Sequence, residues 1–240
     1  MSGREHLHDS VRDTLSEGWK KHFASRHRTL REEGYARSLD HSNERCQLQI
    51  CAHLIEAAGP LSGKALLDAG CGWGMTSLIF EACGARVMGV DIVPDTIAAL
   101  QQGHPLVRWE AVDLTRNEAV QELPMFDVIV AAEVLQYLGA STAVARLWTR
   151  VNPGGRLVGC IPNADCQIVK RVVEREVLQW QPESVAEILR WGRSLPDVND
   201  VKIKPLDFQS DQKFLPYAAG PWGADVQSTA NRLVFVLLRK

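Results

Sequence analysis

The feature that most constrains this chain is a run of alternate glycines placed directly after an apolar stretch. The segment reads Leu66-Leu-Asp-Ala-Gly-Cys-Gly-Trp-Gly74, and a helical pattern follows it. Glycine has no Cβ, so a ligand can approach the backbone of such a turn closely. The N-terminus of the following helix would offer free N–H groups and a partial positive charge to an anion. The pattern therefore predicts a ligand site at the carboxyl end of a buried strand.

The rest of the chain after residue 64 alternates short apolar runs with helical segments, which is typical of a parallel sheet covered on both faces. We expect a doubly wound α/β fold with a seven-stranded, mostly parallel sheet. No convincing helix separates the last two strands, so the last strand should be antiparallel. The expected helices are Thr76–Cys83, Pro94–Gln102, Ser141–Val151 and a longer one over 165–191, broken near Pro182. The expected strands are Ala65–Asp68, Arg86–Asp91, Val107–Ala111, Phe126–Ala131, Leu157–Ile161, Val201–Pro205 and Leu233–Leu238.

The first 60 residues read as an N-terminal helical cap segment, separate from a Rossmann-like domain over 61–240. An apolar stripe recurs every fourth residue, which indicates one helix. A second helix ends at Gly59-Pro60, where glycine can cap the helix and proline cannot continue it. The apolar stripe of the first helix consists of Val11, Leu15, Trp19 and Phe23.

Composition narrows the classes of function. The formal net charge is -2, so no overall positive field favours nucleic acid, and none is expected as a partner. The N-terminus lacks the apolar stretch of a signal peptide, and no run is long enough for a membrane helix. We expect a cytoplasmic protein that does not bind membranes. A homodimer is one alternative for its assembly, which the sequence leaves open.

The six cysteines and the histidines form no metal-binding pattern. The cysteines, at positions 46, 51, 71, 83, 160 and 166, include no CxxC pair. The sequence also has no HExxH motif, so no metal site is expected. We expect the thiols to be reduced and buried as small hydrophobes.

Two features of the glycine turn distinguish between ligand classes. A dinucleotide usually requires G-x-G-x-x-G, and the place of its third glycine is taken by Met75. Asp68 stands just before the turn, where a carboxylate would repel a diphosphate but would suit an ammonium group. The spacing favours a nucleoside that carries an amino acid over a dinucleotide.

The segment Asp68–Gly74 resembles the first motif of class I S-adenosylmethionine methyltransferases, D/E-x-G-x-G-x-G, and the resemblance extends over about 64–161. It implies S-adenosylmethionine as the cofactor. It further implies that Asp91 accepts hydrogen bonds from the ribose hydroxyls, and that Asp113 and the backbone N–H of Leu114 bind adenine. The cofactor-binding residues expected on this basis are Asp68, Gly70, Cys71, Gly72, Gly74, Asp91, Ile92, Asp113, Leu114, Ala131 and Glu133.

A second stretch, from Phe126 to Tyr137, resembles the fourth-strand motif of small-molecule methyltransferases, where a short helix faces the transferred methyl group. Many relatives have histidine at the place of Gln136, so a general base there is in doubt. The stretch also lacks the Asn/Asp-Pro-Pro-aromatic signature of enzymes that methylate planar nitrogens. The segment Val151–Leu157 resembles the loop that enters the fifth strand in this family.

The residues that would act on the acceptor are less constrained. Most histidines lie in the N-terminal segment, which in this family commonly covers the cofactor; the alternative is that they are solvent-exposed. His41, His22 and Glu133 are the catalytic candidates. The expected substrate-binding residues are Tyr35, Tyr137, Tyr217 and Trp222, the last two in a long connection that could equally pack as a satellite of the core.

Together these patterns predict an enzyme that methylates an O or N atom of a small-molecule metabolite. A methyltransferase that acts on protein or RNA is the alternative within the same chemistry. A non-catalytic regulator that binds the cofactor with the same fold is the alternative outside it. A nicotinamide dehydrogenase is disfavoured by Met75.

Overall fold

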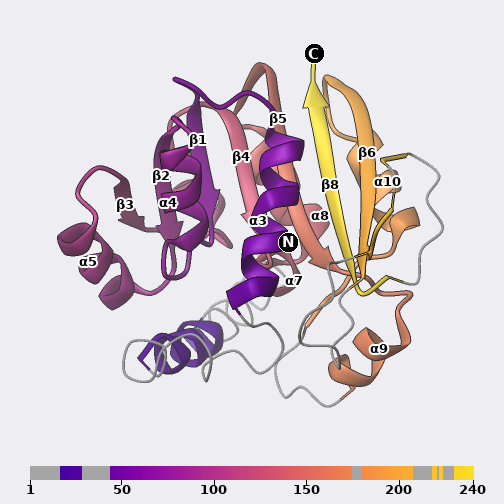
Figure 1. The fold of residues 1–240 in the computed structure, drawn as a ribbon, viewed down its shortest axis with the longest axis horizontal. Coiled ribbons are helices and arrows are strands. Elements are labelled where there is room, and N and C mark those ends of the chain that lie inside the picture. The colour runs from indigo at the N-terminus through magenta and orange to yellow at the C-terminus, as the bar shows by residue number, and fades with distance from the viewer. Residues whose placement is uncertain (1–16, 29–43, 175–179, 208–217, 221, 224–229) are drawn as a thin grey trace, which may run out of the picture.

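The protein folds around one mixed β-sheet, shown in Figure 1. The computed structural model describes residues 17–28, 44–174, 180–207, 218–220, 222–223 and 230–240. Within these residues the strand order is β3-β2-β1-β4-β5-β8-β6-β7. Strands β1 to β5 pair in parallel, whereas β8 runs antiparallel to both β5 and β6. The doubly wound, mostly parallel sheet with an antiparallel last strand is therefore confirmed.

The elements alternate along the chain as the apolar runs predicted. The strands are β1 (Ala65–Ala69), β2 (Arg86–Asp91), β3 (Arg108–Ala111), β4 (Phe126–Ala132), β5 (Val151–Pro162), β6 (Val198–Asp207), β7 (Ala218–Ala219) and β8 (Arg232–Arg239). The labelled helices are α3 (Glu44–Ala58), α4 (Met75–Ala82), α5 (Pro94–Gly103), α6 (Asn117–Gln121), α7 (Leu135–Leu138), α8 (Ala140–Trp148), α9 (Gln167–Val173) and α10 (Val185–Arg193).

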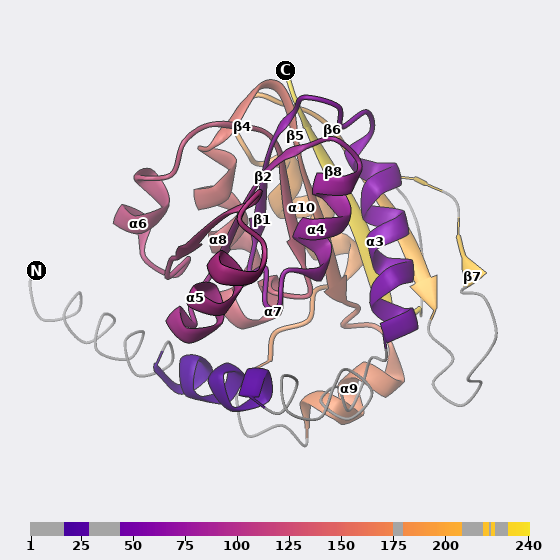
Figure 2. The same cartoon turned by 60° about the vertical axis from the view of Figure 1, so that its left-hand side comes forward.

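Helices cover both faces of the sheet and divide the core into two layers. Buried side chains of α3, α4 and α5 pack on one face, and those of α6, α8 and α10 pack on the other. Figure 2 shows α3 and α4 on the near side of the strands. Because both faces of the central strands are buried, these strands are apolar at nearly every position rather than at alternate ones.

Several elements differ from the sequence expectation, including α6, which was not expected. β5 begins six residues early, at Val151, because Val151 pairs with Phe126 before a register shift lets the strand resume opposite Val128. The expected break near Pro182 is confirmed, because α9 ends before it and Ser184 begins α10 after it, with a capping box to Glu187. β7 was not expected: two residues pair with the end of β6.

The N-terminal part of the chain contributes to the same core as the sheet. Residues 17–28 form a helix, called here the N-terminal helix, which Figures 1 and 2 place across the carboxyl ends of the parallel strands. Ile50 and Leu54 of α3 are buried in one of the two core layers. The division of the chain at residue 60 stays a prediction, and α3 packs directly on the domain after it. No helix in the described residues is long and apolar enough to cross a membrane.

The cysteines are mostly, but not all, buried. Four of the five described cysteines are buried, namely Cys51, Cys71, Cys160 and Cys166, and all five are unpaired. Cys83 is exposed, which corrects the expectation for this residue. It ends α4 at the surface, where the helix meets Gly84.

Candidate cofactor pocket

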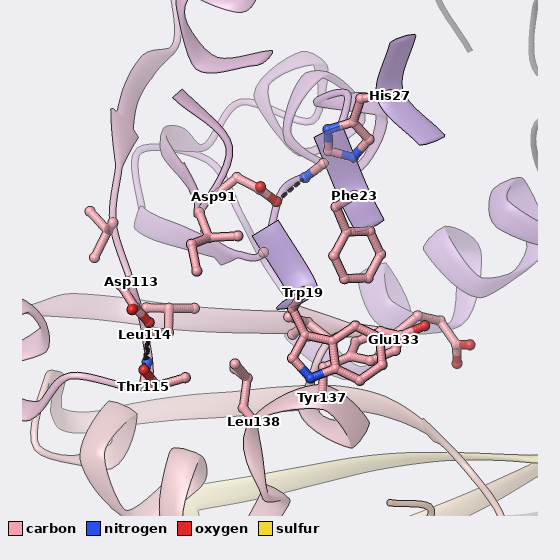
Figure 3. A pocket seen from close by; sticks show the side chains of 15 residues that line it. Trp19, Phe23, His27, Asp91, Asp113, Leu114, Thr115, Glu133, Tyr137 and Leu138 are labelled. Carbon is pink, nitrogen blue, oxygen red and sulfur yellow. Dashed lines mark hydrogen bonds between the residues drawn. The ribbon is translucent and has the colours of Figure 1, made fainter. Parts of the chain in front are cut away.

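A pocket opens at the carboxyl ends of β1 to β4, as Figure 3 shows. The chain leaves β1 toward β2 and β3, and later returns to β4 on the opposite side of β1. At such a switch point the loops diverge and leave room for a ligand. The residues that line the pocket are Trp19, Phe23, His27, Gly70, Gly72, Asp91, Ile92, Val112, Asp113, Leu114, Thr115, Glu133, Val134, Tyr137 and Leu138.

The three glycines of the turn serve different needs. A Cβ on Gly70 would lie 2.4 Å from a methyl carbon of Val134, and one on Gly74 would lie 2.6 Å from the Trp109 ring. These two glycines let protein side chains pack closely against the turn. A Cβ on Gly72 would have no heavy atom nearer than 3.8 Å, so Gly72 is the glycine with free space beside it. All three have positive φ, which favours glycine.

The N–H groups of the turn itself are engaged within the protein. Those at positions 70, 71, 72 and 74 all donate to acceptors within the protein. A diphosphate would have to displace these bonds, so the turn is a poor phosphate cradle. The acceptors are Val90 O for Gly70 and Cys71, an Asp91 carboxylate oxygen for Gly72, and Cys71 O for Gly74.

Asp68 is buried beside the turn with one unsatisfied oxygen. Its Oδ2 accepts a 2.6 Å hydrogen bond from Ser77 Oγ, whereas Oδ1 has no partner among the described residues. Burial raises the pKa of Asp68 to about 7, against the lowering effect of the Ser77 hydrogen bond. Asp68 does not line the pocket. Its unsatisfied oxygen nevertheless suits a donor or a cation near the turn.

Asp91 joins the turn to the end of β2 and faces the pocket. Its Oδ2 accepts from the N–H of Gly72 and its Oδ1 from the N–H of Val93, each at 3.0 Å. A carboxylate oxygen can accept more than one hydrogen bond. Asp91 is therefore held rigidly by the backbone and can still accept from the hydroxyls of a ligand.

The loop after β3 supplies a second carboxylate. Asp113 Oδ1 accepts from the N–H of Thr115 at 2.9 Å and from its hydroxyl at 2.7 Å, which fixes the turn. Leu114 lies between them, buried and lining the pocket. Figure 3 shows Asp113, Leu114 and Thr115 together on one side of the pocket, with Phe23 and His27 on the other.

Glu133 follows β4 and forms a buried ion pair at the pocket. Arg232 Nε donates to both Glu133 oxygens, at 2.8 and 2.9 Å, and only 9% of the Arg232 side chain is exposed. Burial by itself lowers the pKa of Arg232, but the Glu133 carboxylate outweighs that effect and the net pKa is raised. Glu133 also has a left-handed φ of 54°. Such strain in a non-glycine residue is often found at functional sites.

Three aromatic rings form a wall of the pocket. The Trp19 and Tyr137 ring centroids lie 4.5 Å apart, and those of Phe23 and Tyr137 lie 5.0 Å apart. Trp19 and Phe23 come from the N-terminal helix, whereas Tyr137 comes from α7. Burial raises the pKa of Tyr137, so its phenol is protonated at neutral pH. The helix thus covers the pocket through aromatic packing.

Sequence reasoning missed His27. It is 9% exposed, lines the pocket, and its Nδ1 lies 2.7 Å from Thr96 Oγ1. A signal was present, because His27 continues by four residues the stripe that contains Trp19 and Phe23. A stripe defined by apolar residues alone excludes this histidine, although it lies on the same face of the helix.

Several other predicted site residues do not line the pocket. Cys71, Gly74 and Ala131 are packed inside the protein, and His22 lies against the Trp19 and Phe23 rings. Trp222 donates to Glu56 Oε1 at 2.8 Å and lies over Lys204, so the structure supports the satellite-packing alternative for it. Gln136 is buried and donates to the Glu133 carbonyl. His41, Tyr35 and Tyr217 lie outside the described residues.

Comparison with known proteins matches this arrangement to a family. The model of the family described as "Methyltransferase domain" matches residues 41–197, which is more than half of the chain. The chain belongs to this methyltransferase family. The matched range includes the glycine turn, both pocket carboxylates of β2 and β3, and Glu133.

Curated relatives of the methyltransferase domain match a shorter segment. A ubiquinone biosynthesis O-methyltransferase of Pseudomonas putida is 35% identical over 107 residues, which are 43% of this chain and 46% of the relative. One from Pseudomonas fluorescens is 37% identical over 101 residues, 40% of this chain and 44% of the relative. The matches thus span less than half the length of these curated relatives.

Solved structures share the fold of the methyltransferase domain over most of its length. The N-methyltransferase NodS from Bradyrhizobium japonicum, in complex with S-adenosylhomocysteine, has a TM-score of 0.59 and 20% identity, with 90% of this chain and 97% of that chain covered. A 1,6-didemethyltoxoflavin-N1-methyltransferase from Burkholderia thailandensis, with its acceptor and S-adenosylhomocysteine bound, has a TM-score of 0.60 and 17% identity, with 96% and 89% covered.

Proposed function

We propose that this protein transfers a methyl group from S-adenosylmethionine to an O or N atom of a small-molecule acceptor. The observation that carries the proposal is the character of the glycine turn. Its N–H groups at positions 70, 71, 72 and 74 are engaged within the protein, and carboxylates stand before and beside it. Such a turn disfavours a diphosphate and favours a ligand with hydroxyl groups and a positive charge.

The described residues fit the three parts of the cofactor. Asp91 is placed to accept from ribose hydroxyls, with Ile92 beside it, and Asp113 with Leu114 to bind the adenine. The unsatisfied oxygen of Asp68 suits the amino-acid part. Solved relatives of this fold bind S-adenosylhomocysteine, which supports the same assignment.

The catalytic contribution of the protein is alignment. The sulfonium of the cofactor, when bound, supplies an electrophilic methyl group. The aromatic wall of Trp19, Phe23 and Tyr137 excludes water and orients the acceptor, and such alignment is worth about 7–11 kcal/mol for well-placed reactants. Glu133, held by Arg232, presents a carboxylate that can accept a hydrogen bond or a proton from the acceptor. His41 and His22 stay proposals as alternative bases.

The lining of the pocket favours a small acceptor over a nucleic acid. Among the described lining residues three are carboxylates and none is lysine or arginine. A phosphate backbone requires cationic side chains at its binding surface. Relatives named ubiquinone biosynthesis O-methyltransferases and solved N-methyltransferases of small molecules agree with an O or N acceptor of low molecular mass.

Calorimetric titration with S-adenosylmethionine, S-adenosylhomocysteine and NAD tests the proposal. We expect micromolar binding of both adenosyl ligands and none of NAD. Binding of NAD alone would overturn the interpretation of the turn and the proposed activity. Binding of the adenosyl ligands without turnover on any screened acceptor would favour a regulator with the same fold.

Replacing Asp91 with alanine should weaken S-adenosylhomocysteine binding by about 1–3 kcal/mol, or about 5- to 150-fold, because ribose hydroxyls would lose a buried acceptor. Titration calorimetry measures this change. Asp95→Ala provides a matched control, since Asp95 is an exposed carboxylate on the neighbouring helix α5. Equal affinities for wild type and a folded Asp91→Ala variant would remove the ribose role.

A further inference from the structure

His27 is a polar residue beside the aromatic wall of Trp19, Phe23 and Tyr137. It lies one helical turn after Phe23 on the N-terminal helix, and its ring meets the Trp73 ring at a centroid distance of 5.7 Å. Only 9% of the residue is exposed, although it lines the pocket. A histidine buried to this extent needs hydrogen-bond partners for both ring nitrogens.

One ring nitrogen is held by the protein. Nδ1 lies 2.7 Å from Oγ1 of Thr96, a residue of α5 that is 2% exposed. This bond joins positions 69 residues apart in the sequence and fixes the rotation of the imidazole. It also attaches the N-terminal helix to the helix that follows β2.

The other ring nitrogen faces the glycine turn. Nε2 lies 3.8 Å from the point that a Cβ on Gly72 would occupy, and it has no hydrogen-bond partner among the described residues. The N–H of Gly72 in turn donates to Asp91, the proposed ribose acid. Nε2 therefore faces the space beside Gly72, where a ribose bound by Asp91 would lie.

We propose that His27 is a further cofactor-binding residue, whose Nε2 donates a hydrogen bond to a ribose oxygen of the bound adenosyl cofactor. This inference rests on the proposed function. In the tautomer that this role requires, the Thr96 hydroxyl donates to Nδ1, so the proton of the neutral imidazole lies on Nε2 and points toward the ligand. The ribose is then bound from two sides: Asp91 accepts a hydrogen bond from it, and His27 donates one to it.

The charge state of His27 agrees with this role. Burial lowers the pKa of His27, with Asp91 acting in the opposite direction and Arg26 in the same direction as burial. The imidazole is therefore neutral at physiological pH. A neutral imidazole N–H can donate a hydrogen bond to a ribose oxygen without forming an ion pair with the Asp91 carboxylate.

The first test compares His27→Phe with His27→Gln by calorimetry with S-adenosylhomocysteine. Phenylalanine keeps the ring packing against Phe23 and Trp73 but removes the donor, so we expect binding about tenfold weaker, as for one buried hydrogen bond. Glutamine can place an N–H near the position of Nε2 and should recover part of the loss. His104→Gln, which replaces an exposed histidine at the C-cap of α5, is the matched control.

The second test replaces Thr96 with valine, which keeps the shape and removes Oγ1. Because Thr96 acts through His27, the double variant His27→Phe/Thr96→Val should bind no more weakly than His27→Phe alone. Independent, additive losses would contradict the coupling. Urea unfolding of each variant shows whether the fold is retained.

The third test uses 5′-methylthioadenosine, which keeps the adenosine and lacks the amino-acid part. If His27 contacts the ribose, His27→Phe loses the same factor for this ligand as for S-adenosylhomocysteine. A loss restricted to S-adenosylhomocysteine would overturn the ribose assignment, and unchanged affinity for both ligands would overturn the inference alone. If the wild-type protein bound neither ligand, both the proposed function and this inference would be overturned.

Discussion

Glu133→Gln is expected to lower the free energy of unfolding by about 3–5 kcal/mol, the usual cost of leaving a buried charge without its partner. Arg232 is 8% exposed and donates to both Glu133 oxygens. Glutamine fits the same space but cannot compensate the guanidinium charge. Urea denaturation at neutral pH measures the difference.

A thermodynamic cycle separates the ion pair from other effects at Glu133. The double variant Glu133→Gln/Arg232→Met places an apolar side chain in the buried site, so it should recover most of the lost stability. Glu110→Gln removes one partner of the exposed Arg108–Glu110 pair and should cost less than about 1 kcal/mol. If the double variant were less stable than Glu133→Gln, the buried-charge explanation would be wrong.

Asp68→Asn is expected to make the protein more stable at pH 8 but to change little near pH 4. The folded pKa of Asp68 is about 7, against an ordinary value of 3.8, because the carboxyl is fully buried. A group with a raised folded pKa contributes stability below its unfolded pKa and loses it as the pH rises through the folded value. At about 1.4 kcal/mol for each unit of difference, the loss between pH 4 and pH 7 totals about 4 kcal/mol.

Urea denaturation of wild type and Asp68→Asn at half-unit pH intervals checks this prediction. The difference in unfolding free energy should grow between about pH 4 and 7 and then level off. For Asp95→Asn, at an exposed site, the unfolding free energy should vary with pH in the same way as that of the wild type. Parallel curves for Asp68→Asn as well would show that Asp68 ionises normally in the folded protein.

The sheet and the carboxylates of the pocket could be predicted because their causes are local. Apolar runs that are buried on both faces mark the central strands, and the glycines at 70, 72 and 74 mark the turn. Asp91 ends β2 and Asp113 lies two residues after β3, and parallel strands bring their carboxyl ends to one edge of the sheet. The structure places both carboxylates at the pocket, as the order of elements required.

Local sequence patterns thus specify the family of folds, the edge of the sheet that holds the pocket, and the position of its carboxylates. Which polar atoms have hydrogen-bond partners depends instead on tertiary contacts. Pairing of the turn with Val90 and Asp91 consumes its N–H groups, and Arg232, 99 residues away, neutralises Glu133. Tertiary packing likewise brings His27 against Thr96. Such contacts join distant segments by packing, and no local periodicity records them.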